Sequence, residues 1–210
     1  MKIIVISTPY RLQEEHTILT QLFESGLTSF HLRKPRSRYS EIKEYLQGIP
    51  AQYHNRIITH THHKLVKQFR LQGVHYTSVH LQPTLKNWWH SRRLVRYTKD
   101  LVKTASHKKL ATLTEKNDTD YDYVFLTPVF DSITGKFQSG IYEDSLTKVL
   151  QQCGKKVIAM GGIDHRRIER VQELGFSGMA LNSCLWNAAD PAEEFCKIIS
   201  RCRELGIWVE

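Results

Sequence analysis

Short apolar runs alternate with segments of helical periodicity along the whole chain, a pattern typical of β/α units around a parallel sheet. Eight runs are predicted strands: Lys2–Ser7, Ser29–Arg33, Arg56–Thr59, Gly73–Tyr76, Leu101–Ser106, Asp122–Leu126, Lys156–Ala159 and Gly178–Leu181. Their starts lie about 25 residues apart, enough for a strand, a short helix and two loops. The pattern predicts a single (β/α)8 TIM barrel over residues 1–210. An open doubly wound sheet is the alternative, although it would usually have fewer strands at this length.

The segments between the strands carry helix signals. A stripe of apolar residues predicts a helix over Glu14–Ser25. Ser40 and Asp164 are predicted N-caps, and Asp190 with the proline after it is expected to open the last helix. A shortened or irregular helix is expected within Leu81–Asp100.

The composition is that of one globular domain, with 210 residues, 40% of them hydrophobic and 24% charged. A single core suffices at this length, so neither disulfides nor a metal is needed for folding. No apolar run approaches the roughly 20 residues of a membrane span, and the first strand is too short for a signal peptide. We therefore expect a cytoplasmic protein with no membrane contact. Its four cysteines lack close pairs and are expected to be reduced thiols packed as small hydrophobes.

The formal charge of +9 attracts nucleic acids and phosphorylated metabolites alike. Nucleic-acid binding is suggested by the basic segment Lys86–Lys109, whose Trp88 and Trp89 could stack on bases. We expect instead that the two tryptophans pack their segment against the barrel. A homodimer through exposed helices is a further possibility.

In a TIM barrel the loops at the C-terminal ends of the strands build the functional site. Gly161 and Gly162 follow the seventh predicted strand, and Asn182 and Ser183 follow the eighth. Loops in these two positions usually bind phosphate, because backbone N–H groups before a helix attract anions. The alternatives are a tight turn for the glycines and a helix cap for Ser183. The pattern favours a phosphorylated small molecule as ligand.

Two cations are candidate catalytic groups. Arg33 ends the second strand, where its fork of donors could bind a second phosphate group. Lys136 lies in the long loop Thr127–Ile141 beside Gly135, which suggests a mobile cationic lid. The alternatives are an ordinary surface arginine and a solvated loop lysine.

Histidines are unusually frequent at the predicted strand ends. His31, His60, His80 and His107 lie there as candidate substrate-binding residues, and four imidazoles could also converge on a transition metal. No pair has the spacing of a known zinc motif, so hydrogen bonding within the fold is the alternative. Carboxylates for Mg²⁺ are nearly absent, and Asp131 is the main candidate.

Several dispersed motifs, in the right order, together resemble the thiamine-phosphate synthase and thiazole tautomerase family. The resemblance covers nearly the whole chain. The family's Gln-x-Arg, Gly-Val-His, Ser-x-His and Gly-Pro-Val-Phe segments correspond to His31-Leu32-Arg33, Gly73-Val74-His75, Ala105-Ser106-His107 and Thr127-Pro128-Val129-Phe130. Its Ala-Ile-Gly-Gly-Ile strand and turn correspond to Val157-Ile158-Ala159-Met160-Gly161-Gly162-Ile163.

The resemblance implies a transferase of thiamine biosynthesis that joins hydroxymethylpyrimidine diphosphate to thiazole phosphate and releases diphosphate. Arg33 would then contact the diphosphate, and Lys136 would approximate the family's loop lysine. Gly161, Gly162 and Ser183 would hold the thiazole phosphate.

The chain departs from the family at the metal. The family implies Mg²⁺, but its Asn-Asp pair falls on His60 and Thr61, and its second magnesium aspartate falls on His80. The lysine of the strand-two motif, the serine after strand five and the tautomerase histidine correspond to Pro35, Ala105 and Pro128. Synthase activity is the leading expectation, and a tautomerase-like or noncatalytic phosphate-binding relative is the alternative.

Overall fold

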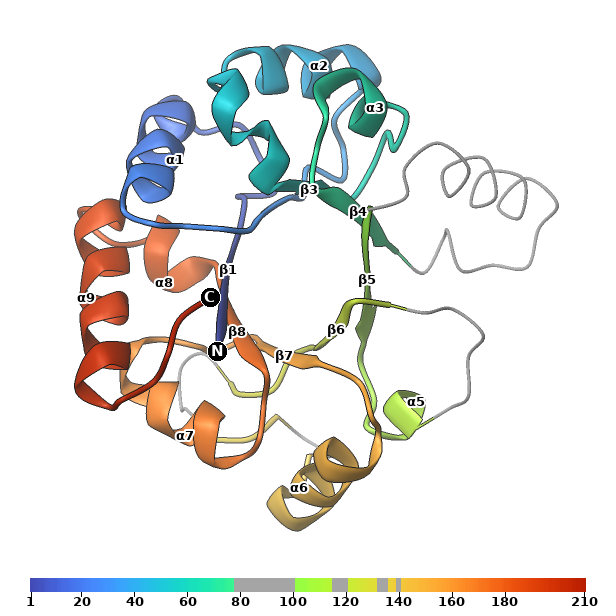
Figure 1. Cartoon of the computed structure of the whole chain (residues 1–210), viewed down its shortest axis with the longest axis vertical. Helices are drawn as coiled ribbons and strands as arrows, with labels where there is room; N and C mark the ends of the chain where they lie inside the picture. Colours follow the sequence, from blue (N-terminus) through green and yellow to red (C-terminus); the bar gives the residue numbers. More distant parts are fainter. Residues whose placement is uncertain (78–100, 115–120, 132–135, 139–140) are drawn as a thin grey trace, which may run out of the picture.

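The computed structural model describes residues 1–77, 101–114, 121–131, 136–138 and 141–210. It contains a closed barrel of parallel strands in chain order, β1 to β8 (Figure 1). The bounds of β1 to β8 are Lys2–Ile6, Phe30–Leu32, Ile57–Thr59, Gly73–Tyr76, Val102–His107, Tyr123–Leu126, Val157–Met160 and Gly178–Leu181. All eight predicted strands are confirmed. Because β1 also pairs with β8, with Lys2 opposite Gly178, the sheet has no edge and the open alternative is wrong.

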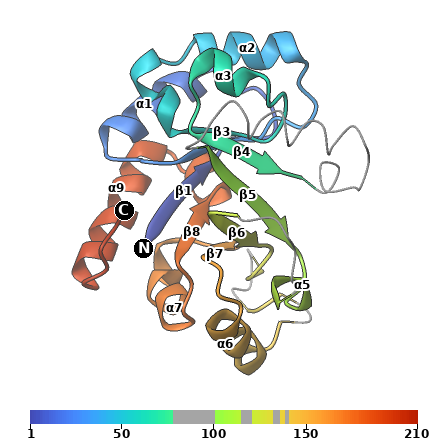
Figure 2. The same ribbon diagram turned by 45° about the vertical axis from the view of Figure 1, so that its right-hand side comes forward.

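Helices surround the barrel on its outside, as both views show (Figures 1 and 2). The α-helices α1, α2, α3, α5, α6, α7, α8 and α9 cover Glu15–Glu24, Tyr39–Gln47, Leu65–Phe69, Ala111–Thr114, Glu143–Gln152, Ile168–Glu173, Ser183–Trp186 and Pro191–Glu204. Two 3₁₀ turns, η1 and η2, cover Ala51–Arg56 and His165–Arg167. None of the helices in the described ranges combines the length and apolar character of a bilayer span.

Two of the three predicted N-caps are confirmed. The Asp190 carboxylate accepts hydrogen bonds from the N–H groups of Ala192 and Glu193, at 2.9 and 3.0 Å, and so caps α9. The Asp164 carboxylate accepts from the N–H of Arg166 at 3.0 Å. Asp164 therefore caps η2, the turn that leads into α7.

Ser40 is not a cap, because α2 begins one residue before it and Arg38 occupies the N-cap position. The Glu41 carboxylate accepts from the backbone N–H of Arg38 at 2.6 Å, which pairs the donor of the N-cap residue itself. The expected irregular helix in Leu81–Asp100, and most of the basic segment with its two tryptophans, lie outside the described residues.

The cysteines match their prediction only in part. All four are free thiols. Cys202 is buried in the core, and burial raises the pKa of the half-buried Cys184 to about 11. Cys196 is exposed, so it is not a packed hydrophobe as expected.

Two apolar clusters lie on the two faces of the barrel wall. The larger fills the space between strands and helices, and the smaller fills the barrel interior. The interior cluster contains Ile4, Ile6, Ile58, Tyr123, Phe125, Ile158 and Ala180. Side chains alternate between the two faces along each strand, so the remaining inward positions belong mainly to β2 to β5. Polar side chains, above all His31, His75 and Thr104, fill them.

Candidate functional site

The turn after β7 presents unpaired backbone donors. Gly161 and Gly162 have φ angles of +95° and +66°, a backbone region that favours glycine. Within the described ranges no group accepts a hydrogen bond from the N–H of either glycine. The carbonyls of Met160 and Gly161 accept from the N–H groups of Val129 and Phe130, at 2.9 and 3.2 Å, which ties this turn to the loop after β6. The turn is thus held rigidly with its donors available for an anion.

The two residues predicted to bind ligand at the end of β8, Asn182 and Ser183, have different roles. The Asn182 side-chain amide donates to the carbonyls of Ile6 and Ser7, at 2.8 and 3.1 Å, which anchors it to β1. Ser183 is exposed and is the first residue of α8. No acceptor in the part of the chain that the structure describes takes its backbone N–H. The side chain of Asn182 is therefore occupied, whereas Ser183 presents a donor beside the glycine turn.

Arg33 lies just past β2 on the same end of the barrel. Its backbone is fixed by Ser7, whose hydroxyl accepts from the Arg33 N–H at 2.8 Å and lies 3.1 Å from the Arg33 carbonyl. The guanidinium is exposed, and no described residue forms a hydrogen bond or ion pair with it. Arg33 therefore offers its full set of donors at the mouth.

Lys136 is exposed at the base of the loop after β6. Its carbonyl accepts from the N–H of Asp131 at 2.8 Å. Next to it, Phe130 and Phe137 form an antiparallel bridge and stack with ring centroids 5.2 Å apart. These contacts hold the two ends of the loop together. Residues 132–135 and 139–140 of the predicted lid lie outside the described residues.

Three buried histidines meet in the barrel interior. His31 Nδ1 lies 2.9 Å from His60 Nε2. The rings of His60 and His75 stack with centroids 4.0 Å apart and an interplanar angle of 18°. The exposed fractions of His31, His60 and His75 are only 0%, 5% and 3%. We call these three residues the histidine cluster.

The histidine cluster differs from the group of four expected from the sequence. His107 does not belong to it, because its Nδ1 lies 2.9 Å from the hydroxyl of Thr112, beside the barrel wall. His80 lies outside the described residues. His75 was missed as a candidate, although its position two residues after Gly73 puts it on the inward face, opposite Thr104 of β5.

Hydroxyl groups orient the rings of the histidine cluster. His31 Nε2 lies 2.7 Å from the hydroxyl of Tyr123. His75 Nδ1 lies 2.8 Å from the Thr104 hydroxyl, and its Nε2 lies 3.1 Å from the Ser106 hydroxyl. The pKa values of His31 and His60 lie well below the usual range. Burial is the main cause, and the neighbouring His75 is the second. Both rings are therefore neutral at pH 7.

Replacing Tyr123 by phenylalanine is expected to lower the free energy of unfolding by about 1–3 kcal/mol. The change leaves a buried nitrogen of His31 without its hydroxyl partner. Urea denaturation at pH 7.5 measures the effect. Tyr142→Phe is the control, because Tyr142 is 74% exposed and its replacement should leave stability unchanged. Equal effects of the two replacements would show that the hydroxyl of Tyr123 does not stabilise the cluster.

The residues at the expected Mg²⁺ positions do not fit that ion. His60 offers nitrogen and Thr61 a hydroxyl, where the resemblance implied a carboxylate. Across the described ranges, the one cluster of three potential metal ligands is His31, His60 and His75, and it contains no carboxylate. Mg²⁺ prefers oxygen ligands, carboxylates in particular.

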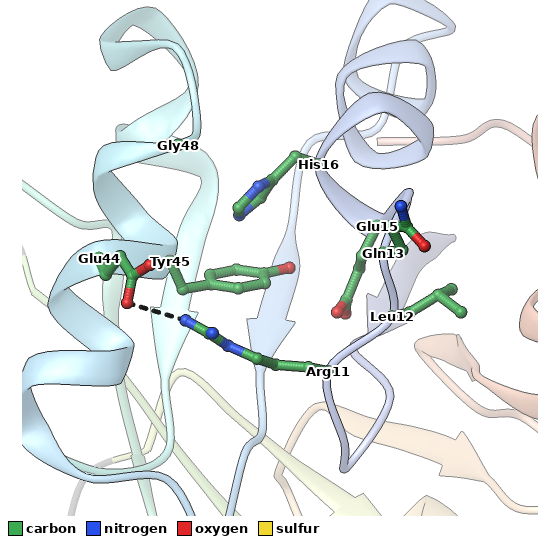
Figure 3. A pocket seen from close by; sticks show the side chains of 8 residues that line it. All are labelled: Arg11, Leu12, Gln13, Glu15, His16, Glu44, Tyr45 and Gly48. Carbon is green, nitrogen blue, oxygen red and sulfur yellow. Dashed lines mark hydrogen bonds and ion pairs between the residues drawn. The ribbon is translucent and has the colours of Figure 1, made fainter.

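A separate cleft of about 570 Å³ lies outside the barrel, next to α1 and α2 (Figure 3). It is lined by Arg11, Leu12, Gln13, Glu15, His16, Glu44, Tyr45 and Gly48. The Glu15 carboxylate forms a buried ion pair with the ammonium group of Lys34. Lys34 thus points away from the mouth at which its neighbour Arg33 is exposed.

Comparisons with known proteins agree with this architecture. Residues 3–185 match the family model described as thiamine monophosphate synthase. A curated thiamine-phosphate synthase from Prochlorococcus marinus strain AS9601 is 24% identical over 182 residues, which make up 87% of this chain and 48% of that protein. A second, from Prochlorococcus marinus subsp. pastoris, is 28% identical over 109 residues, or 48% of this chain and 31% of that protein. The chain thus spans less than half the length of these curated relatives.

Solved structures of similar proteins have the same barrel fold. A thiamine phosphate pyrophosphorylase from Bacteroides thetaiotaomicron is 28% identical, with a TM-score of 0.78 over 97% of this chain and 98% of that chain. One from Pyrococcus furiosus is 19% identical and shares the fold, with a TM-score of 0.76 over 97% of this chain and 96% of that chain. With a family match that covers most of the barrel, this chain belongs to the thiamine monophosphate synthase family.

Proposed function

We propose that this protein binds thiazole phosphate at the turns after β7 and β8 and joins it to hydroxymethylpyrimidine diphosphate, a step of thiamine biosynthesis. The observation that carries the proposal is the set of backbone N–H groups of Gly161, Gly162 and Ser183, for which the described residues provide no acceptor. Such donors bind a phosphate ester without needing a basic side chain. The names of its relatives, thiamine-phosphate synthase and thiamine phosphate pyrophosphorylase, support the same reaction.

In this proposal Arg33 and Lys136 act on the diphosphate. The diphosphate leaves with the electron pair of the broken bond, so negative charge develops on its oxygens. Arg33 is exposed at the mouth and has no partner among the described residues, so its guanidinium is available to bind two phosphate oxygens at once. Lys136 would add a second positive charge from the loop after β6.

A second candidate function is phosphate-ligand binding without the synthase reaction, as in a tautomerase-like or noncatalytic relative. The observation that favours it is the absence of carboxylates from the described metal-ligand cluster. Both functions use the turn at Gly161 and Gly162 to bind phosphate. A binding measurement therefore cannot distinguish them, and an activity measurement is needed.

Replacing Arg33 by alanine is expected to weaken the binding of hydroxymethylpyrimidine diphosphate about 10- to 100-fold, because a charge-assisted hydrogen bond contributes about 1.5–3 kcal/mol. Isothermal titration calorimetry measures the change. Arg203→Ala is the matched control, since Arg203 is an exposed arginine in the last turn of α9 and should bind like the unmodified protein. Unchanged affinity of the Arg33→Ala variant would remove Arg33 from the site.

The reaction itself is tested by mixing the protein with hydroxymethylpyrimidine diphosphate and thiazole phosphate, with and without Mg²⁺, and measuring thiamine phosphate. Product formation supports the synthase. If no product forms but thiazole phosphate raises the melting temperature, the protein is a phosphate-ligand binder. If millimolar thiazole phosphate causes no thermal shift either, both candidate functions are wrong.

A further inference from the structure

We propose that His31, His60 and His75 bind one divalent transition-metal ion of the Zn²⁺ class inside the barrel. This inference does not depend on the proposed function, because it rests only on the three side chains and their surroundings. One ligand nitrogen from each of the three rings can be chosen so that all lie within 4.8 Å of one another. All three residues are buried.

The distances are close to those of a metal site. With Zn–N bonds of about 2.0–2.1 Å, two nitrogens in a tetrahedral site lie about 3.3 Å apart. His31 Nδ1 and His60 Nε2 are 2.9 Å apart, so they must separate by about 0.4 Å to admit the ion. The third nitrogen must approach by at most about 1.5 Å, and the ring of His75, which stacks on that of His60 at an interplanar angle of 18°, must also tilt so that its nitrogen points at the ion.

The protonation of the cluster also suits a metal. Two neutral imidazoles share one proton in the contact between His31 and His60, and a cation can take its place when that proton moves to the other nitrogen of its own ring. Coordination through His31 Nδ1 leaves its Nε2–H to donate to the hydroxyl of Tyr123. Coordination through His75 Nε2 leaves its Nδ1–H to donate to the hydroxyl of Thr104. Metal-binding histidines are usually oriented in this way by a second hydrogen bond.

The donor set selects the type of ion. Three imidazole nitrogens suit Zn²⁺, Co²⁺, Ni²⁺ or Cu²⁺, whereas Mg²⁺ prefers oxygen. Three protein ligands leave a fourth position open for water or for an oxygen of a bound molecule. Ser106, whose hydroxyl contacts His75, is exposed, so the cluster has a polar route to solvent.

The charges around the cluster imply what fills the fourth position. The positive charge of Lys2 disfavours positive charge on His31, and that of Arg33 disfavours it on His60. No carboxylate in the described part of the chain joins the cluster. A buried divalent ion therefore needs an anion as its remaining ligand. Hydroxide or a phosphate oxygen meets this need.

The experiment uses the whole chain, freed of metal with a chelator and then dialysed, and titrates it with Co²⁺ alone. Co²⁺ in a site with three nitrogen ligands should give visible absorption bands that saturate at about one equivalent. Zn²⁺ should abolish the bands by competition, and millimolar Mg²⁺ should leave them unchanged. Failure of Co²⁺ to give saturable bands, or displacement of Co²⁺ by Mg²⁺, would overturn the proposal.

Variants locate the ion. His60→Asn is expected to weaken Co²⁺ binding about 100-fold, because it removes one of three ligands. The control is His165→Asn, which changes an exposed histidine on η2 and should bind Co²⁺ normally. Equal affinity of the two variants would contradict the proposal.

A second measurement uses the unmodified protein, so its result does not depend on whether a variant folds. In the unmodified protein, Zn²⁺ should shift the ring-nitrogen NMR signals of His31, His60 and His75 together. Shifts confined to other histidines would also overturn the proposal. None of these measurements uses a phosphorylated ligand, so their failure leaves the proposed function untouched.

Discussion

Replacing Lys34 by methionine is expected to lower the free energy of unfolding by about 3–5 kcal/mol, because the change leaves a buried carboxylate without its counter-ion. The side chains of Lys34 and Glu15 are only 2% and 1% exposed. The Lys34 ammonium also donates to the hydroxyl of Thr8 at 3.0 Å and to the carbonyl of Tyr10 at 2.6 Å. Urea denaturation at pH 7.5 measures the loss.

The same cleft offers a matched control for this ion pair. Arg11 and Glu44 form a pair at 2.9 Å whose side chains are 62% and 71% exposed (Figure 3). Arg11→Ala is expected to cost at most about 1 kcal/mol, because solvent screens exposed pairs. Adding Glu15→Leu to Lys34→Met should recover much of the lost stability, since it removes the unpaired charge. Equal losses from the Lys34 and Arg11 variants would mean that burial does not make this ion pair important.

Replacing Gly162 by alanine is expected to cost about 3 kcal/mol of stability and to weaken thiazole phosphate binding at least about tenfold. The residue has a φ angle of +66°, which strains an L-amino acid. An added Cβ would lie 2.6 Å from the carbonyl oxygen of Phe130, and this contact is with backbone. The turn would have to move, and its N–H donors with it. Thermal denaturation and calorimetry measure the two effects.

Gly154 is the matched control for this replacement. Its φ angle is +62°, but no atom lies within 4 Å of the Cβ that alanine would add. Gly154→Ala should therefore cost only the backbone strain, about 1 kcal/mol, and should leave ligand binding unchanged. If both variants lose the same stability and both bind thiazole phosphate normally, the close approach of Gly162 to the loop after β6 is unimportant for the site.

Two groups of residues in the barrel are expected to bind different ligands. The turn at Gly162 and the exposed Arg33 concern phosphate binding, which agrees with the family. The histidine cluster includes a departure from the family at His60, where a nitrogen ligand stands at an implied magnesium position, whereas His75 corresponds to the histidine of the family's Gly-Val-His segment. Measuring phosphate binding and metal binding separately will therefore show whether the two groups have changed independently.

The sequence by itself determined the barrel and the position of the glycine turn after β7. Strand and helix periodicity are local properties, so eight strands and the caps at Asp164 and Asp190 were predictable. The cap predicted at Ser40 was wrong, because α2 begins at Tyr39 and places Ser40 inside its first turn. Gly161 and Gly162 were singled out because paired glycines between a strand and a helix either make a tight turn or present backbone donors to an anion. The tertiary structure adds that the loop after β6 holds this turn, because Val129 and Phe130 donate to the carbonyls of Met160 and Gly161.

The tertiary structure alone decided which side chains meet. His75 joins His31 and His60, whereas His107 does not, because each strand points alternate side chains inward and the register between strands decides which of them share a layer. Lys34 and Arg33 are adjacent and both carry a cationic side chain, yet one is buried against Glu15 and the other is exposed at the mouth. Position along the chain does not carry this information, because it arises only when distant strands and helices pack together.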